Sequence, residues 1–194
     1  MFAQLGQGLR NMSRAGNVLI AHPNLTSNNP WYKTVIYIFE DNHKGTQGLV
    51  INKPSDLHVS NFLANRGMQM PHSIETMRYG GPLQSNLVLM LHTDHWYSKS
   101  TRVIGNGIAL SYDDFMFEKM CMGDTPGLYR VAVGMAQWQP GQLAAELAGT
   151  PPYKPENSWL IAEADAGLLF EHDREKQWHK AVEMSSAQMI NHFF

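Results

Sequence analysis

Two closely spaced histidines, His92 and His95, are the first residues of this sequence whose chemistry suggests a site. Imidazole nitrogens bind zinc, but a zinc site commonly has three or more protein ligands. A strand is expected to end near His92, so side chains three residues apart there would point in different directions. Cys121 is the only cysteine, which excludes a cysteine-rich zinc site and an intrachain disulfide. We therefore expect no metal ion.

Motifs for covalent catalysis or phosphate binding are missing. The sequence has no G-x-S-x-G motif, and Cys121 has no histidine close to it in the chain. Gly80-Gly81-Pro82 lacks the spacing of a phosphate-binding loop and indicates a tight turn or a close approach of two backbone segments. We expect no catalytic residue, no enzyme activity and no cofactor. An acidic band near the C-terminus is interspersed with lysine and arginine, as on a solvated face: Glu163, Asp165, Glu171, Asp173 and Glu175.

The segment Trp138-Gln-Pro-Gly-Gln142 predicts a sharp corner between a strand and a helix. Pro140 presets φ near −65° and Gly141 accepts a positive φ, so the pair suits the centre of a type II turn. Two interpretations follow. The corner either packs Trp138 as a stability residue, or presents Trp138, Gln139 and Gln142 to a ligand.

A second polar motif, Asn52-Lys53-Pro54, stands where an apolar strand is expected to end. Residues at strand ends are often site residues, although asparagine also bonds to nearby backbone groups. The candidate binding surface that the sequence suggests comprises Asn52, His92, Trp138, Gln139 and Gln142.

Apolar runs bounded by turn residues predict the elements that must position these side chains. Strands are expected at residues 18–21, 34–39, 48–52, 87–91, 103–104, 108–110, 129–138 and 158–162, with turn residues at 40–46. Helices are expected after Pro54-Ser55 (carrying Leu57, Phe62 and Leu63) and at about 114–122, 142–147 and 173–184. Runs of strands broken by a few short helices indicate an α+β fold in which the strand runs are buried.

Bulk composition narrows the function classes. The 194 residues suit a single domain, and the net charge is −2. The sequence pI is about 6.5, whereas a nucleic-acid-binding domain typically exceeds about 9 or carries a basic stripe. Nucleic acid is therefore a partner that the charge does not support. No apolar run approaches the roughly 20 residues of a membrane span, and residues 1–10 lack the apolar core of a secretory signal, so we expect no membrane association and a cytoplasmic location.

Four motifs in order carry a family resemblance: Gly16-Asn-Val-Leu-Ile-Ala-His-Pro23, Gly45-Thr-Gln-Gly-Leu-Val-Ile-Asn-Lys-Pro54, Tyr79-Gly-Gly-Pro82 and Gly134-Met-Ala-Gln-Trp-Gln-Pro-Gly-Gln-Leu-Ala-Ala-Glu-Leu147. Over residues 16–181 the chain resembles the YqgE/AlgH family of small bacterial proteins. The resemblance implies an α+β domain whose mixed sheet folds into a pseudo-barrel with helices packed outside. Family members are labelled transcriptional regulators, and the resemblance brings no cofactor or catalytic residue.

Several positions depart from the family pattern. The hairpin reads Asp41-Asn42 where the family usually has histidine before asparagine. Before the turn the chain reads Gly134-Met-Ala-Gln-Trp138 where the family usually has Gly-Tyr-Ala-Gly-Trp, so Met135 replaces a tyrosine and Gln137 a glycine. Ala144 stands where glutamate often follows Gln-Leu. These changes remove polar groups from the places that a shared active site would use, and they favour a divergent member retained for its shape.

Three hypotheses of function follow. The first is a non-catalytic binding or regulatory module with a protein partner. The second, which rests on the family label alone, is a DNA-binding transcriptional regulator. The third is a small-ligand binder or enzyme that uses Asn52, His92, Trp138 and Gln142. The sequence leaves the oligomeric state open.

Overall fold

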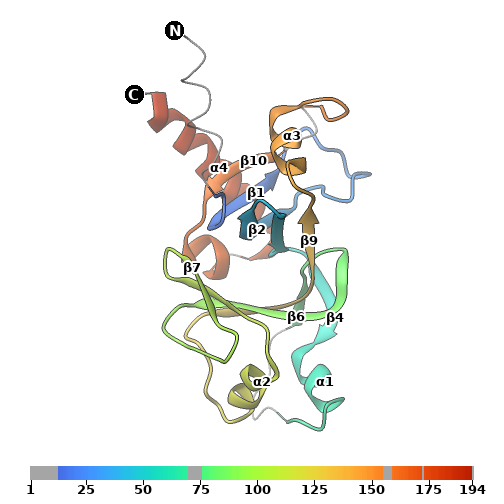
Figure 1. The fold of residues 1–194 in the computed structure, drawn as a ribbon, viewed down its shortest axis with the longest axis vertical. Helices are drawn as coiled ribbons and strands as arrows, with labels where there is room; N and C mark the ends of the chain where they lie inside the picture. The colour runs from blue at the N-terminus through green and yellow to red at the C-terminus, as the bar shows by residue number, and fades with distance from the viewer. Residues whose placement is uncertain (1–12, 70–75, 155–158, 172, 194) are drawn as a thin grey trace.

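A single hydrogen-bonded sheet organises the computed structural model, which describes residues 13–69, 76–154, 159–171 and 173–193 (Figure 1). The strands follow the order β10-β1-β2-β3-β9-β6-β8-β7. Their bounds are β1 Asn17–Ala21, β2 Val35–Asn42, β3 Gly45–Val50, β6 Leu83–Thr93, β7 Arg102–Gly105, β8 Ile108–Ser111, β9 Tyr129–Trp138 and β10 Trp159–Glu163.

Strand β9 links the two halves of this sheet. Its last residues, 136–138, pair with β3, whereas residues 129–133 pair with β6. Two further strands, β4 (Pro54–His58) and β5 (Thr76–Tyr79), pair with each other, and β5 runs parallel to β9. The sheet is therefore mixed and rolls into a partial barrel, which confirms the predicted α+β class and the pseudo-barrel that the resemblance implied.

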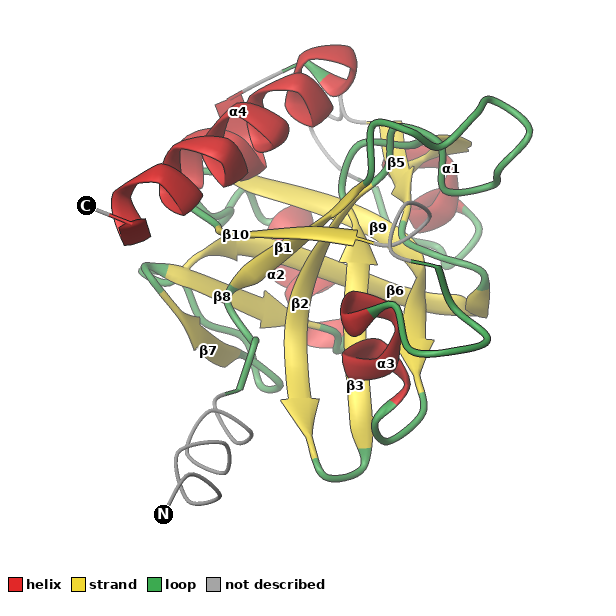
Figure 2. Cartoon of the chain, turned by 90° about the horizontal axis from the view of Figure 1, so that it is seen from above, coloured by secondary structure: helices red, strands yellow, loops and turns green. Residues whose placement is uncertain are grey.

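Within the described residues, four α-helices and one π-helical turn pack outside the sheet (Figure 2). They are α1 Val59–Ala64, α2 Asp114–Cys121, α3 Gln142–Ala148, α4 Arg174–Phe193 and the π-helical turn Gly167–Glu171. Helix α4 lies along β10 and β1, where the Trp178 indole donates to the Ala21 carbonyl at 2.9 Å. In the described part of the chain, no helix is both long enough and apolar enough to cross a membrane.

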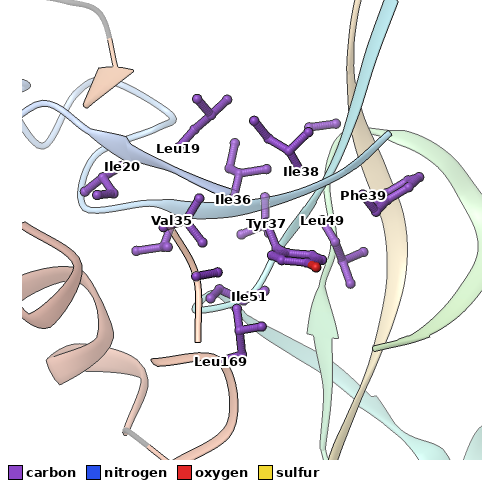
Figure 3. Packing of buried hydrophobic residues seen from close by; sticks show 14 of the residues in the cluster. Leu19, Ile20, Val35, Ile36, Tyr37, Ile38, Phe39, Leu49, Ile51 and Leu169 are labelled. Atoms are coloured by element: carbon purple, nitrogen blue, oxygen red, sulfur yellow. The ribbon is translucent and has the colours of Figure 1, made fainter. Parts of the chain in front are cut away.

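The larger apolar core surrounds β1, β2 and β3. Figure 3 shows Ile36 and Ile38 on one side of β2 and Tyr37 on the other, the side on which Ile51 and, from the π-helical turn, Leu169 also lie. Because side chains alternate along a strand, both faces of β2 are covered, and residues 35–38 have no exposed surface. The predicted burial of the strand runs is confirmed for β1, β2 and β3, whereas Leu87, Val133, Leu160 and Ile161 are half-buried.

A second apolar cluster lies across the sheet from the first. Along β6, Leu89 and Leu91 belong to the larger core, while Val88 and Met90 belong to the second cluster. That cluster includes Leu63 of α1 and further side chains of α2. The two clusters therefore share strands of one sheet.

Two local predictions need correction. The helix expected after Pro54 begins only at Val59, because β4 pairs with β5 and leaves Leu57 48% exposed in a strand. The backbone N–H of Leu57 donates to the Ser55 hydroxyl at 3.1 Å, a local bond that competes with helix formation. The turn expected at residues 40–46 is also shorter, because β2 extends to Asn42 and β3 begins at Gly45.

Candidate functional site

The corner between β9 and α3 has the predicted turn geometry. The Gln142 N–H donates to the Gln139 carbonyl at 2.9 Å, across Pro140 and Gly141. Gly141 has φ 78° and ψ −13°, which are the values of the third residue of a type II turn. Helix α3 begins at Gln142 and brings Glu146 one turn further along the same face.

Glu146 is the centre of a hydrogen-bonded cluster that joins three elements. Its Oε2 accepts from the indole Nε1 of Trp138 at 3.1 Å and of Trp159 at 2.9 Å. Its Oε1 accepts from Nε2 of Gln142 at 2.9 Å. One carboxylate on α3 therefore fixes the rings of β9 and β10. An ionised carboxylate has about four acceptor positions, so the described residues leave roughly one of them open on Oε1.

A hollow of about 340 Å³ opens beside this cluster. We call it the tryptophan hollow and define it by Trp31, Trp138, Trp159, Gln142 and Glu146, all of which line it. The ring of Trp159 lies edge-on to both neighbours, with centroids 5.6 Å from Trp31 and 6.1 Å from Trp138. Three aromatic rings and a carboxylate thus share one small cavity.

The rim of the hollow depends on a close crossing of two backbone segments. A Cβ at Gly81 would lie 2.1 Å from the Met135 carbonyl carbon, and one at Gly134 would lie 2.5 Å from the Gly81 carbonyl oxygen. The predicted close approach at Gly80-Gly81-Pro82 is confirmed. It aligns Leu83 with Met135 of β9 and so brings Leu83 to the wall of the hollow.

His92 lies in the core, away from the tryptophan hollow. Its Nδ1 is 2.8 Å from the Thr93 carbonyl, so Nδ1 carries the proton and Nε2 accepts from the Ser111 hydroxyl at 2.9 Å. The Ser111 oxygen in turn lies 2.7 Å from the Thr101 hydroxyl. Burial lowers the pKa of His92, although the bond to the Thr93 carbonyl and the charge of Asp94 oppose the shift.

The His92–Ser111 pair has the spacing of a base and its nucleophile, and sequence reasoning missed it because Ser111 comes from another strand. Both side chains have no exposed surface. A substrate carbon could not reach the hydroxyl without opening the sheet, so we assign the pair a structural role.

Asn52 lies at a third location, apart from both the tryptophan hollow and His92. Its Oδ1 accepts from the Val35 N–H at 2.9 Å and its Nδ2 donates to the Lys33 carbonyl at 2.8 Å, which ties the end of β3 to the start of β2. It also lines a larger groove of about 990 Å³. The structure therefore brings Trp138 and Gln142 together at the tryptophan hollow, with exposed Gln139 at the adjoining turn, and places Asn52 and His92 elsewhere.

Metal-ligand side chains do not converge in the part of the chain that the structure describes, where no three of them are grouped. His92 is buried, whereas the side chain of His95 is 94% exposed and lies 3.6 Å from Asp94. The two rings therefore do not face a common site.

The fold defines the class of protein, an α+β domain built on one partly rolled mixed sheet, and comparison with known proteins defines the family. The model of the family described as AlgH-like matches residues 18–189. UPF0301 proteins of Actinobacillus pleuropneumoniae and Idiomarina loihiensis are 34% and 33% identical, covering 87% and 88% of this chain and 90% of each relative. The chain belongs to the AlgH-like family, which confirms the resemblance.

Solved structures agree with this assignment. The solution structure of the AlgH protein from Pseudomonas aeruginosa has a TM-score of 0.73 and 29% identity, over 89% of both chains. A crystal structure from Corynebacterium diphtheriae has a TM-score of 0.61 at 24% identity, over 86% of this chain and 85% of that one, and it supports the fold alone.

Sequence reasoning missed three residues of the hollow: Trp31, Glu146 and Trp159. For Glu146 a signal existed, because a glutamine and a glutamate four residues apart share a helix face just after the turn. Nothing local pointed to Trp31 or Trp159, because they reach the hollow only through the pairing of β10 and β1 and the loop before β2.

Proposed function

We propose that this protein is a non-catalytic binding module whose tryptophan hollow accepts a lysine or arginine side chain of a protein partner. The observation that carries the proposal is the state of Glu146. Its carboxylate accepts three neutral N–H groups, and no described lysine, arginine or histidine lies within ion-pair distance of it.

Charge and shape favour a cationic occupant. The faces of aromatic rings carry negative potential, and a cation within about 6 Å of an indole gains roughly 0.5–2 kcal/mol. The carboxylate of Glu146, which forms no ion pair with a described residue, also attracts a positive charge. The volume of the hollow, about 340 Å³, is at the lower end of the range for ligand pockets. A single lysine or arginine side chain would fill only part of it.

The arrangement of polar groups supports binding without chemistry. In the hollow, the carboxylate and both indole N–H groups are already hydrogen-bonded to each other, so none is poised to transfer a proton. The one nucleophile–base pair noted above, His92–Ser111, is fully buried. The Trp138 and Trp159 rings are already held in place by the Glu146 carboxylate, so binding a partner's side chain would cost little conformational entropy, as in other pre-organised sites.

Calorimetric titration with a lysine-rich peptide tests the proposal. We compare the wild-type protein with Glu146→Gln, which keeps a carbonyl oxygen for the two indoles and removes the charge. Glu163→Gln is the matched control, because Glu163 is exposed on β10 and does not line the hollow. We expect Glu146→Gln to weaken binding by at least about tenfold, or about 1.4 kcal/mol, with the control unchanged.

Equal binding by wild type and Glu146→Gln would refute the proposal, as would equal binding of the peptide with its lysines acetylated. If Glu146→Gln does not fold, Trp31→Leu takes its place, because Trp31 is half-buried and makes no bond to Glu146 among those described.

A further inference from the structure

A second hollow has the opposite charge. It is the groove of about 990 Å³ that Asn52 lines, and we call it the lysine groove after Lys33, Lys53 and Lys176, which line it together with Tyr32 and Trp178. The three lysines come from the loop before β2, the segment between β3 and β4 and the first turn of α4. Ammonium groups from three separate segments therefore share one cavity.

Lys33 is held in place by unusual backbone geometry. Its φ is 50°, in the left-handed region that residues other than glycine seldom adopt. Asn52 supports that conformation by donating to the Lys33 carbonyl and accepting from the Val35 N–H. The Lys33 ammonium lies 5.5 Å from the ring centroids of both Tyr32 and Trp178, so the ammonium stays within the groove.

Lys53 is half-buried and carries its charge at a cost. Its Nζ donates to the Tyr32 carbonyl at 2.7 Å, and burial lowers its pKa. No described carboxylate forms an ion pair with Lys33 or Lys53. An anion near Lys53 would offset the cost of removing its ammonium from water.

The described walls of the groove have a surplus of positive charge. Asp173 is the one described carboxylate that lines it, and it lies 3.6 Å from Lys176 at a largely exposed position. Three lysines against one carboxylate leave a local excess of two positive charges, with His179 counted as neutral. The whole chain has a net charge of −2, so this excess is a local feature.

We infer that the lysine groove binds a small phosphate-bearing anion, with Lys33 and Lys53 as the charges that anchor it. Lysine acts on phosphate as a mobile point charge with three donors, which tolerates different phosphate geometries. A groove of about 990 Å³ is large enough for a polyphosphate or a whole nucleotide. The site is separate from the tryptophan hollow, so this inference does not depend on the function proposed above.

Calorimetric titration at low salt with pyrophosphate and with ATP tests the inference and separates the two sources of the anion. We expect pyrophosphate to bind the wild-type protein and the exposed control Lys44→Gln equally. Lys33→Gln and Lys53→Gln should each weaken binding by at least about tenfold. ATP binding tighter than pyrophosphate identifies a nucleotide as the ligand, and equal binding identifies a free polyphosphate; both support the site.

Three results would overturn it. The first is no binding of either probe at low salt, where screening of charges is weak. The second is equal binding by the lysine variants and Lys44→Gln. The third is binding of a single-stranded oligonucleotide without binding of either small probe. Thermal melts without ligand check that each variant folds. If Lys53→Gln does not, Lys176→Gln replaces it, because the Lys176 side chain is 76% exposed.

Discussion

Truncation of Trp138 to alanine should cost the protein a large share of its stability. The side chain is 4% exposed, and burial of an indole removes about 150–250 Å² from water. At about 25 cal/mol per Å² this area is worth roughly 4–6 kcal/mol, close to the 3–5 kcal/mol found for such truncations. The lost bond to half-buried Glu146 adds about 1 kcal/mol. Added to the 3–5 kcal/mol of such truncations, this gives an expected total of about 4–6 kcal/mol.

Thermal melts followed by circular dichroism measure this change. For a chain of this length, 1 kcal/mol shifts the melting temperature by about 2–4 °C, so Trp138→Ala should melt roughly 8–24 °C lower. Trp138→Phe keeps a buried ring and loses only part of the area and the indole N–H. It should lose about 1–2 kcal/mol, which is about 2–8 °C by the same conversion.

A matched control shows whether the loss of stability comes from burial of the ring or from the loss of any aromatic side chain. Tyr97 is 57% exposed, and Tyr97→Ala should stay within about 0.5 kcal/mol of the wild type. A melting temperature for Trp138→Ala within about 2 °C of the wild type would refute the reasoning. It would mean that the ring is present for binding and contributes little to folding.

Three further changes test other parts of the structure. Gly81→Ala should lower the melting temperature strongly or abolish soluble expression, because its Cβ would meet the Met135 backbone at 2.1 Å; normal stability would contradict the close crossing. Tyr37→Phe should leave stability unchanged or raise it by about 1 kcal/mol in urea melts, because the buried hydroxyl has no hydrogen-bond partner among the described residues; a loss above about 1 kcal/mol would argue otherwise. Burial lowers the pKa of His92 below its ordinary value of 6.5, so as the pH falls the unfolded chain binds a proton at His92 at a higher pH than the folded chain does. Stability should therefore fall as the pH drops below about 6.5 toward the folded pKa, and His92→Gln should flatten that slope in urea melts at pH 5–8; an identical slope would remove His92 as its cause.

Local patterns predicted most of the fold. The strand over residues 129–138 and the Pro140-Gly141 turn were predictable because side-chain alternation, fixed φ and permitted positive φ are properties of neighbouring residues. The segment after Pro54 was not, because pairing of β4 with β5 overrides the apolar spacing that suggested a helix. That pairing depends on a strand more than 15 residues away, which a local window does not see.

The candidate site was predictable only at its corner. Trp138 and Gln142 follow from the turn, but the partner that fixes them, Glu146, has to be recognised from a helix face. Trp159 joins them because β10 pairs with β1 at the edge of the sheet, a long-range contact with no local signature. Asn52 shares the polar character of these residues, but its amide bridges backbone groups of β2 instead.

The most direct test of the proposal that the tryptophan hollow binds a cationic side chain is a nuclear magnetic resonance titration of the full chain with a lysine-rich peptide. The indole N–H signals report on the site, because the N–H groups of Trp138 and Trp159 both donate to Glu146. We predict that both signals shift in a saturable way with the lysine peptide and remain in place with its acetylated form, while the Trp178 indole on α4 is unaffected. Unchanged Trp138 and Trp159 signals at peptide saturation, or equal shifts with the acetylated peptide, would contradict the account.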